Sequence, residues 1–353
     1  MGLCQGKDTA VKAPMVTQPQ IVPGSSSSTE LFATAVASAK AAPRSRSNAH
    51  AAAARLYCLL APSDPLLDDI DFVDAPDVVA MSTCIRLPGP TSPFRQVAAL
   101  AVQNKSFKCR MEDTCVIQAH LPADVQLYAI YDGHGSHVVS TYLAQHFHVE
   151  LIQRRLAMPG LSMESVVSDT FESIDTALES LDAADQCGST AVVLVANGSN
   201  HITVANCGDS HCLYVTADGV VARITQDHHV RNATEVSRIK AKHGMILNHR
   251  VSGVSKVTRA FGQHDDKDFV IAKPAITTIT VEPARTDDEC ASRGYFVLMS
   301  DGISDVLQDQ EIARYVSTGL AMGWAVDIIC QTLVDLCKVK RARDNMSVVL
   351  VLT

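Results

Sequence analysis

Short apolar blocks alternate with polar turns over most of this chain, and the blocks carry two different periods. Blocks rich in Val, Ala, Ile and Leu that are bounded by Gly, Asn, Asp or Pro are typical of β-strands. The predicted strands are residues 96–103, 109–121, 125–132, 190–196, 201–208, 211–224, 275–282, 294–301 and 345–353. Residues 197–200 and 217–219 are predicted to be hairpin turns, because their Asn and Gly tolerate the left-handed backbone that tight turns need.

Three longer segments instead repeat their apolar residues at steps of three and four, which is the period of an amphipathic helix. The predicted helices are residues 136–156, 163–184 and about 309–338. Strands, then a pair of helices, then strands again fit an α+β fold in which helices cover antiparallel sheets.

The first quarter of the chain lacks these periods. Residues 1–50 are rich in Ser, Ala and Pro and are predicted to be disordered, and residues 51–60 are predicted to form a short helix. Residues 61–77 are acidic and interrupted by Pro, which favours a linker or a docking strip. We therefore expect two parts, an extension over residues 1–93 and a globular domain over residues 94–353.

Composition narrows the classes of protein. The chain has 353 residues, of which 47% are hydrophobic, and this is enough for one large core or two small ones. Its net charge of −8 argues against a nucleic-acid partner. The 11 cysteines form no CxxC pair, and no apolar run reaches the roughly 18 residues of a membrane helix. Together with the lack of a secretory signal, these features predict reduced thiols and a cytoplasmic location.

Acidic residues recur where the predicted strands begin or end. They are Glu112, Asp113, Asp132, Asp209, Asp301, Asp305 and Asp344. Any one of them alone is more often a turn or cap residue. As a set they favour a metal site, because carboxylates beside apolar strands are costly to bury unless they are paired or metal-bound, and Mg²⁺ and Mn²⁺ prefer oxygen ligands. His134 follows Asp132 in the segment YDGHGSH (131–137), as a candidate proton donor.

Six ordered segments carry a family resemblance: RMED, YDGHGS, GSTAVV, NCGDS, MSDGISDVL and DNMSVVLV. In order and approximate spacing they resemble the metal-dependent type 2C protein serine/threonine phosphatases, over about residues 94–353. The resemblance implies a four-layer α-β-β-α sandwich with two central antiparallel sheets and a two-metal site at one end. It also implies activity on phosphoserine and phosphothreonine in proteins, by direct attack of a water that bridges two Mg²⁺ or Mn²⁺ ions.

The resemblance assigns a role to each of these residues. Asp132 would bridge both metals, and the Gly133 carbonyl would add a ligand. Glu112 would bind one metal, while Asp301 and Asp344 would bind the other. His134 would be the general acid that protonates the leaving oxygen. The remaining three carboxylates, which would orient water or hold a weaker third metal, are Asp113, Asp209 and Asp305.

The sequence departs from the family pattern in four places. Lys108 stands where the family has a phosphate-binding Arg, and Arg110 is a candidate substitute, because residues i and i+2 of a strand share a face. The other three departures are His211 for Arg, Gln263 for Asp and Ser304 for Trp.

Two rival interpretations remain open from the sequence. One is a pseudophosphatase scaffold, although members of that kind typically lose metal carboxylates that this chain retains. The other is a phosphoaspartate phosphatase, because residues 69–73 read DIDFV, although no buried strand is predicted before them.

The amino terminus adds a separate hypothesis. The sequence MGLCQGKD partly fits N-myristoylation at Gly2, with palmitoylation of Cys4 as the second signal for stable membrane anchoring. The alternative is an unmodified tail. We therefore expect a monomeric cytoplasmic protein with a lipid-anchored fraction at the membrane, where phosphoproteins are its partners.

Overall fold

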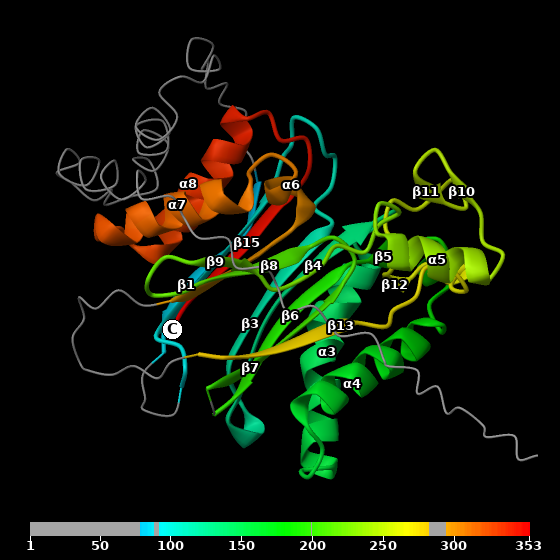
Figure 1. The fold of residues 1–353 in the computed structure, drawn as a ribbon, viewed down its shortest axis with the longest axis horizontal. Helices are drawn as coiled ribbons and strands as arrows, with labels where there is room; N and C mark the ends of the chain where they lie inside the picture. The colour runs from blue at the N-terminus through cyan, green and yellow to red at the C-terminus, as the bar shows by residue number, and fades with distance from the viewer. Residues whose placement is uncertain (1–77, 88–91, 199, 282–293) are drawn as a thin grey trace, which may run out of the picture.

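Two antiparallel sheets form the centre of the molecule (Figure 1). The computed structural model describes residues 78–87, 92–198, 200–281 and 294–353. The first sheet has the spatial order β1 (Val78–Arg86), β2 (Gln96–Gln103), β15 (Met346–Leu352), β14 (Tyr295–Met299), β8 (His211–Val215) and β9 (Val221–Arg223). The second has the order β12 (Phe261–Gly262), β5 (Gly188–Ser189), β4 (Val125–His134), β6 (Ala191–Asn197), β7 (His201–Cys207) and β13 (Ala275–Thr280), and β3 (Asp113–Leu121) pairs with β4.

The central strands β2, β6, β14 and β15 are mostly apolar because both of their faces are buried. In β2, Val97 and Ala99 face the core between the two sheets. Ala98 and Leu100 of the same strand face the helices that cover the first sheet. Because successive side chains point to opposite faces of the strand, this continuous apolar run contributes to two cores, one on each face.

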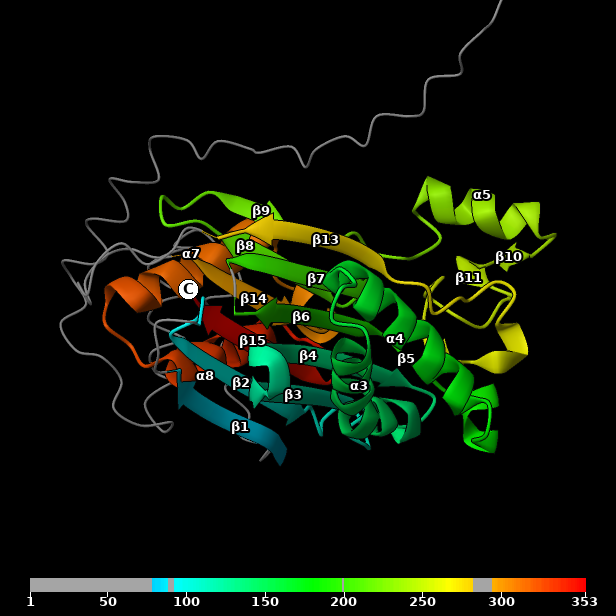
Figure 2. The same ribbon diagram turned by 90° about the horizontal axis from the view of Figure 1, so that it is seen from below.

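Helices close the sandwich on both sides, as Figure 2 shows. The first sheet is covered by α6 (Asp301–Ser304), α7 (Asp309–Ala321) and α8 (Val326–Val339). The second is covered by α3 (Val138–Ala157) and α4 (Met163–Leu178). The predicted four-layer α-β-β-α sandwich is confirmed.

A smaller projection, called the flap here, spans residues 228–270. It contains α5 (Ala233–Ala241), β10 (Ile246–Leu247) and β11 (Arg250–Val251). Its own apolar cluster is separate from the three main cores and consists of Ile239, Val251, Val257, Ala260 and Val270. Three short 3₁₀ helices complete the described elements: η2 (Pro122–Asp124), η3 (Asp182–Asp185) and η4 (His264–Asp266).

The prediction of one long helix over residues 309–338 is wrong. The segment is two helices, and Gly323 separates them with a φ of 71°. The amides of Gly323 and Trp324 donate to the carbonyls of Leu320 and Gly319, both at 2.9 Å. This pair of hydrogen bonds is a Schellman C-cap, which ends α7 and redirects the chain into α8.

Two predicted boundaries also differ from the structure. Strand β1 (Val78–Arg86) pairs along its length with β2, so the first sheet includes residues that were predicted to belong to the extension over residues 1–93. The predicted strand 109–121 begins only at Asp113, and residues 104–112 form a loop.

The predictions for the disordered tail, the helix 51–60, the DIDFV segment, Gly2 and Cys4 lie outside the described residues. Within the residues that are described, no helix has both the length and the apolar character needed to cross a membrane.

Candidate metal centre

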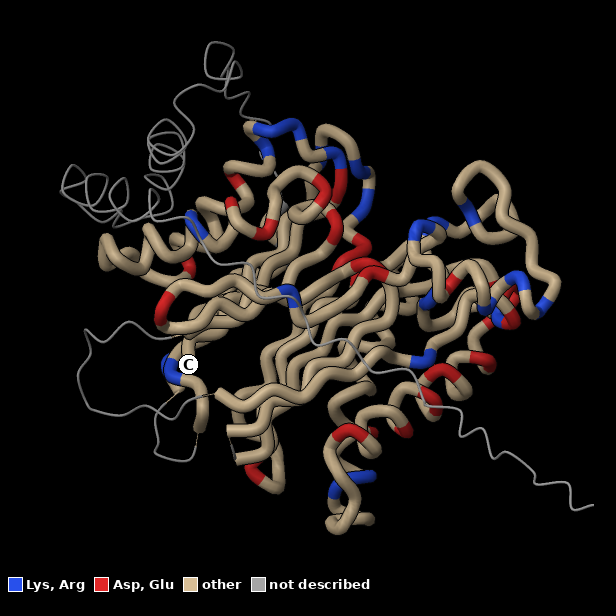
Figure 3. Tube along the Cα trace, viewed as in Figure 1, with Lys and Arg blue, Asp and Glu red and all other residues tan. Residues whose placement is uncertain are grey.

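The predicted carboxylates meet at one end of the sandwich, where strands of both sheets begin or end. Asp113 opens β3 and pairs in register with Asp132 near the end of β4. Asp301 opens α6 after β14, and Asp209 follows β7. Figure 3 shows acidic positions gathered beside α6, with basic positions on neighbouring loops. Segments far apart in the sequence therefore bring their carboxylates to one place.

These carboxylates oppose one another's ionisation. Burial, together with the charges of Asp113 and Asp301, raises the pKa of Asp132 well above its ordinary value. Burial and Asp301 raise the pKa of Asp209 to about 8. Burial and Asp344 raise the pKa of Asp301 to about 6. A bound cation would reverse this effect, because an adjacent opposite charge favours the ionised form.

Asp113 lies behind this group and is held by two serines. Its Oδ2 accepts hydrogen bonds from Ser347 Oγ at 2.7 Å and Ser300 Oγ at 3.0 Å. Burial still raises the pKa of Asp113 to about 7. The sequence analysis did not single out these serines. Their signal was present, since Ser347 is a polar residue within the otherwise apolar strand β15 and Ser300 directly follows the apolar strand β14.

The backbone around Gly133 is tightly packed. The Gly133 amide donates to the Glu112 carbonyl at 3.2 Å, and Ser140 Oγ donates to the same carbonyl at 2.5 Å. A Cβ at position 133 would lie only 2.6 Å from that oxygen, so only glycine fits here. These contacts fix the main chain of Glu112 beside the turn that carries Asp132.

Lys108 reaches the carboxylates, whereas Arg110 does not contact them. Lys108 Nζ lies 2.5 Å from Asp344 Oδ1 and 3.9 Å from Glu112 Oε2. Burial lowers the pKa of Lys108, but Asp344 and the other carboxylates outweigh burial and raise it. The premise that Lys108 and Arg110 share a strand face is wrong, because both lie in the loop before β3. Arg110 is exposed on that loop.

His134 contacts the flap. Its Nε2 lies 3.0 Å from Gln263 Oε1, and an amide oxygen can only accept, so Nε2 carries the proton of this hydrogen bond. Burial lowers the pKa of His134 from its ordinary value, and the Lys267 charge acts in the same direction. A Cβ at position 188 would lie 2.5 Å from Nε2, so Gly188 provides the space for the imidazole.

His211, one of the departures from the family pattern, is buried among charges. Its Nδ1 lies 3.5 Å from Asp227 Oδ1. Arg223 of β9 donates to Asp227 Oδ2 at 3.1 Å and to both carboxylate oxygens of Asp309 at 2.9 Å. Arg223 of the neighbouring strand thus supplies the positive charge that pairs with Asp227 and Asp309 beside His211.

The donor set suits a hard divalent cation, since it consists of carboxylate and carbonyl oxygens. Within the described ranges, no three His, Cys, Asp or Glu side chains stand close enough to form a complete metal cluster. Mg²⁺ uses few protein ligands and retains several waters, so a site without such a cluster is compatible with it. The residues that could hold the cations are Glu112, Asp132, Gly133, Asp301 and Asp344.

Comparison with known proteins gives consistent matches. A family model described as protein phosphatase 2C matches residues 99–346. The chain is 32% identical over 266 residues to protein phosphatase 1B of Homo sapiens, a match that covers 70% of this chain and 55% of that protein. It is 31% identical over 262 residues to protein phosphatase 1A of Bos taurus, covering 70% of this chain and 68% of that protein. The chain thus spans just over half the length of the human relative.

Solved structures share the fold. A sex-determining protein of C. elegans aligns with a TM-score of 0.63 at 21% identity, covering 74% of this chain and 65% of that chain. A phosphatase from a pathogenic strain of Toxoplasma gondii aligns with a TM-score of 0.62 at 19% identity, covering 73% and 92%. At these identities the two structures support the architecture alone.

Proposed function

Because this chain belongs to the protein phosphatase 2C family, we propose that it is a metal-dependent phosphatase that hydrolyses phosphoserine and phosphothreonine in proteins. One observation carries the proposal beyond family membership. Four carboxyl groups (Asp113, Asp132, Asp209 and Asp301) lie where burial and mutual repulsion raise their pKa values. Such a concentration of buried acid is unfavourable unless cations bind to it.

The proposed ligands fall into two groups, one for each metal position. Asp132 and the Gly133 carbonyl stand at the end of β4 beside Glu112, and together they would hold one part of a two-metal site. Asp301 and Asp344 would hold the other part, with Asp209 and Asp305 available to a weaker third ion. When bound, Mg²⁺ or Mn²⁺ would activate a water and neutralise charge on the phosphoryl oxygens.

The remaining roles fall to groups that do not bind the cations. His134 would give its proton to the leaving serine or threonine oxygen, and its lowered pKa makes its protonated form a stronger acid. Lys108 would orient the substrate phosphate or balance the charge of Asp344, from which its Nζ lies 2.5 Å. Arg110, exposed on the same loop, is a candidate second phosphate contact.

The test is release of inorganic phosphate from a phosphothreonine peptide by the full chain with Mn²⁺, with Mg²⁺, or with EDTA. We expect turnover with either metal and none with EDTA. Asp132→Asn should abolish the turnover, whereas the control Asp124→Asn, at an exposed position in the β3–β4 turn, should not. Turnover that survives EDTA would contradict the proposal, and a folded chain inactive with both metals would instead favour the pseudophosphatase scaffold.

A further inference from the structure

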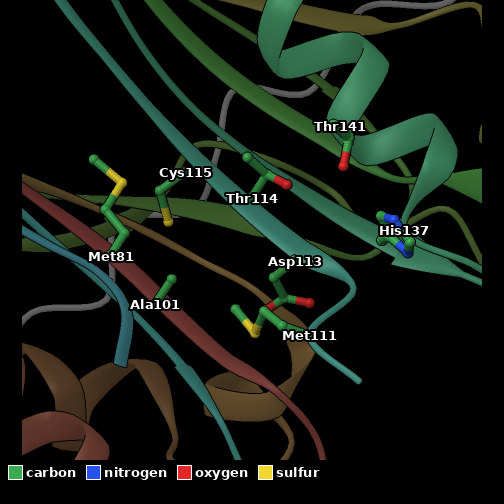
Figure 4. Close-up of a pocket in the computed structure, with 8 residues that line it drawn as sticks. All are labelled: Met81, Ala101, Met111, Asp113, Thr114, Cys115, His137 and Thr141. Carbon is green, nitrogen blue, oxygen red and sulfur yellow. The ribbon is translucent and has the colours of Figure 1, made fainter. Parts of the chain in front are cut away.

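An open hollow lies next to the carboxylate site, between two strands at the edges of their sheets. It has a volume of about 380 Å³ and is bordered by β1 on one side and β3 on the other (Figure 4). Its apolar lining comes from Met81, Ala101, Met111 and Cys115, and Asp113 lies at its polar side. Methionine side chains are flexible and adapt to varied apolar partners, so this hollow suits an apolar side chain from an extended segment.

Two loops form the border of the site next to this hollow, and they are fixed to each other. Asn104 Nδ2 donates to the Ala342 carbonyl at 2.7 Å. Asn345 Nδ2 donates to the Arg110 carbonyl at 3.1 Å. Residues 104–112 and 340–345 therefore act as one surface.

That surface is basic and partly apolar. Its exposed basic residues, called the basic rim here, are Lys105, Arg110, Arg341 and Arg343. Phe107 stands among them with 55% of its surface exposed, and the Arg343 guanidinium lies 5.9 Å from the centre of its ring. Both features favour a partner that combines carboxylates with apolar side chains.

The chain itself enters the fold beside this surface. In the pairing of β1 with β2, Val78 lies opposite Gln103, the last residue before the loop 104–112. Val78, to which residues 64–77 are joined, therefore lies close to the loop that carries Lys105 and Arg110. Residues 64–77 read DPLLDDIDFVDAPD, which combines six aspartates with five large apolar side chains and contains no Lys or Arg.

We propose that residues 64–77 dock on the hollow and the basic rim of their own chain. The aspartates lie along the rim, and Phe72 enters the apolar hollow. Phe72 is six residues from Val78 and can reach up to about 20 Å from it, whereas Met81 lies only three residues into β1, so Phe72 can fold back to the hollow without strain. The covalent link gives the segment an effective concentration in the millimolar range, which favours it over a separate acidic protein.

Docking has a consequence for the site that rests on the proposed function. Lys108 and Glu112 lie on the loop that carries half of the basic rim. A segment lying on this loop competes for the basic rim with the acidic residues that flank the phosphorylated residue of a substrate. Residues 64–77 would thus raise the KM of the enzyme for acidic phosphoproteins and leave turnover at saturation unchanged.

Carbodiimide cross-linking tests the docking without using activity. The reagent joins a carboxylate to a nearby lysine amine, and tryptic peptide 56–86 contains the whole segment but no lysine. At low salt we expect amide links from Asp68, Asp69 or Asp71 to Lys105 in the full chain. The links should fall at least threefold in Phe72→Ser and in 1 M salt, where charges are screened beyond about 3 Å.

Asp124→Asn combined with Asp218→Asn removes two exposed charges from turns outside the site, and should leave the links unchanged. The docking would be overturned if no link to Lys105 formed. It would also be overturned if links from the segment to Lys242 or Lys273 were as frequent as those to Lys105.

Kinetics then test the competition. Asp69→Asn combined with Asp71→Asn should lower the KM for an acidic phosphothreonine peptide about threefold to tenfold, the size expected for two solvent-exposed ion pairs. The Asp124→Asn, Asp218→Asn control removes the same charge and should leave KM unchanged. Equal KM values for the two double variants would refute competition between residues 64–77 and the substrate. A chain without turnover would refute only the proposed function, because the cross-links measure docking without using activity.

Discussion

Replacement of Glu235 by glutamine is expected to loosen the flap selectively. Glu235 is 1% exposed and lies on α5. Its carboxylate accepts hydrogen bonds from Arg259 Nη2 at 2.6 Å, from Arg238 Nη2 at 2.9 Å and from Thr258 Oγ1 at 3.0 Å. The bonds from Arg259 and Thr258 join α5 to the segment that returns from the flap to β12, whereas the bond from Arg238 lies within α5.

The size of the effect can be worked from the pKa of Glu235. Burial alone would raise this pKa, but Arg259 and Arg238 outweigh burial and lower it from 4.5 to about 2. A shift of this size corresponds to about 3 kcal/mol of stabilisation at neutral pH. Removing one partner of a buried ion pair typically costs 3–5 kcal/mol. Since both arginines retain some contact with water, we expect Glu235→Gln to lose about 2–3 kcal/mol.

Hydrogen exchange measured by mass spectrometry is the appropriate assay, because the flap has its own small apolar cluster and can open without the rest of the fold. Amides of α5 should exchange about 30- to 150-fold faster in Glu235→Gln, while those of β4 and β14 should not change. Glu172→Gln makes the same substitution at an exposed position of α4 and serves as the control.

The pH dependence gives an independent check. The pKa of Glu235 is lower in the folded state, so its stabilisation is complete above about pH 4.5 and is lost as the pH falls toward 2. The protection of α5 in the wild type should therefore approach that of Glu235→Gln in this range. Equal protection of the two proteins at pH 7 would refute the reasoning.

Other predictions concern the site and the amino terminus. Asp132→Asn and Asp301→Asn should each reduce Mn²⁺-dependent phosphate release by more than about 100-fold, measured at limiting metal, because each removes a proposed ligand. Lys108→Ala removes the ammonium group 2.5 Å from Asp344, so it should lower the Mn²⁺ concentration needed for half-maximal activity. Arg110→Ala should raise KM more than it lowers kcat in steady-state assays, and wild-type kinetics would leave Lys108 as the phosphate contact. Gly2→Ala should shift the protein from membrane to soluble fractions of eukaryotic cells without changing its kinetics, and identical distributions would refute lipid anchoring.

Strands that are buried on both faces are the ones whose sequence pattern identifies them. The apolar runs of β2, β6 and β15 identify strands because both of their faces are buried. β1 was not predicted, since it is an edge strand with mixed composition that the sequence analysis placed in the extension. The break at Gly323 was also not predicted, because the hydrogen bonds from the Gly323 and Trp324 amides that end α7 do not alter the helical spacing of the apolar residues.

The sequence by itself determined the α+β class, most of the elements and the identity of the acidic residues at strand ends. Those properties depend on local periodicity, which neighbouring residues carry. Only the tertiary structure decided that Ser347 and Ser300 hold Asp113, and that Lys108 lies against Asp344 rather than on a strand face with Arg110. Such contacts join residues about 200 positions apart, and they depend on the register and packing of two sheets, which no local pattern specifies.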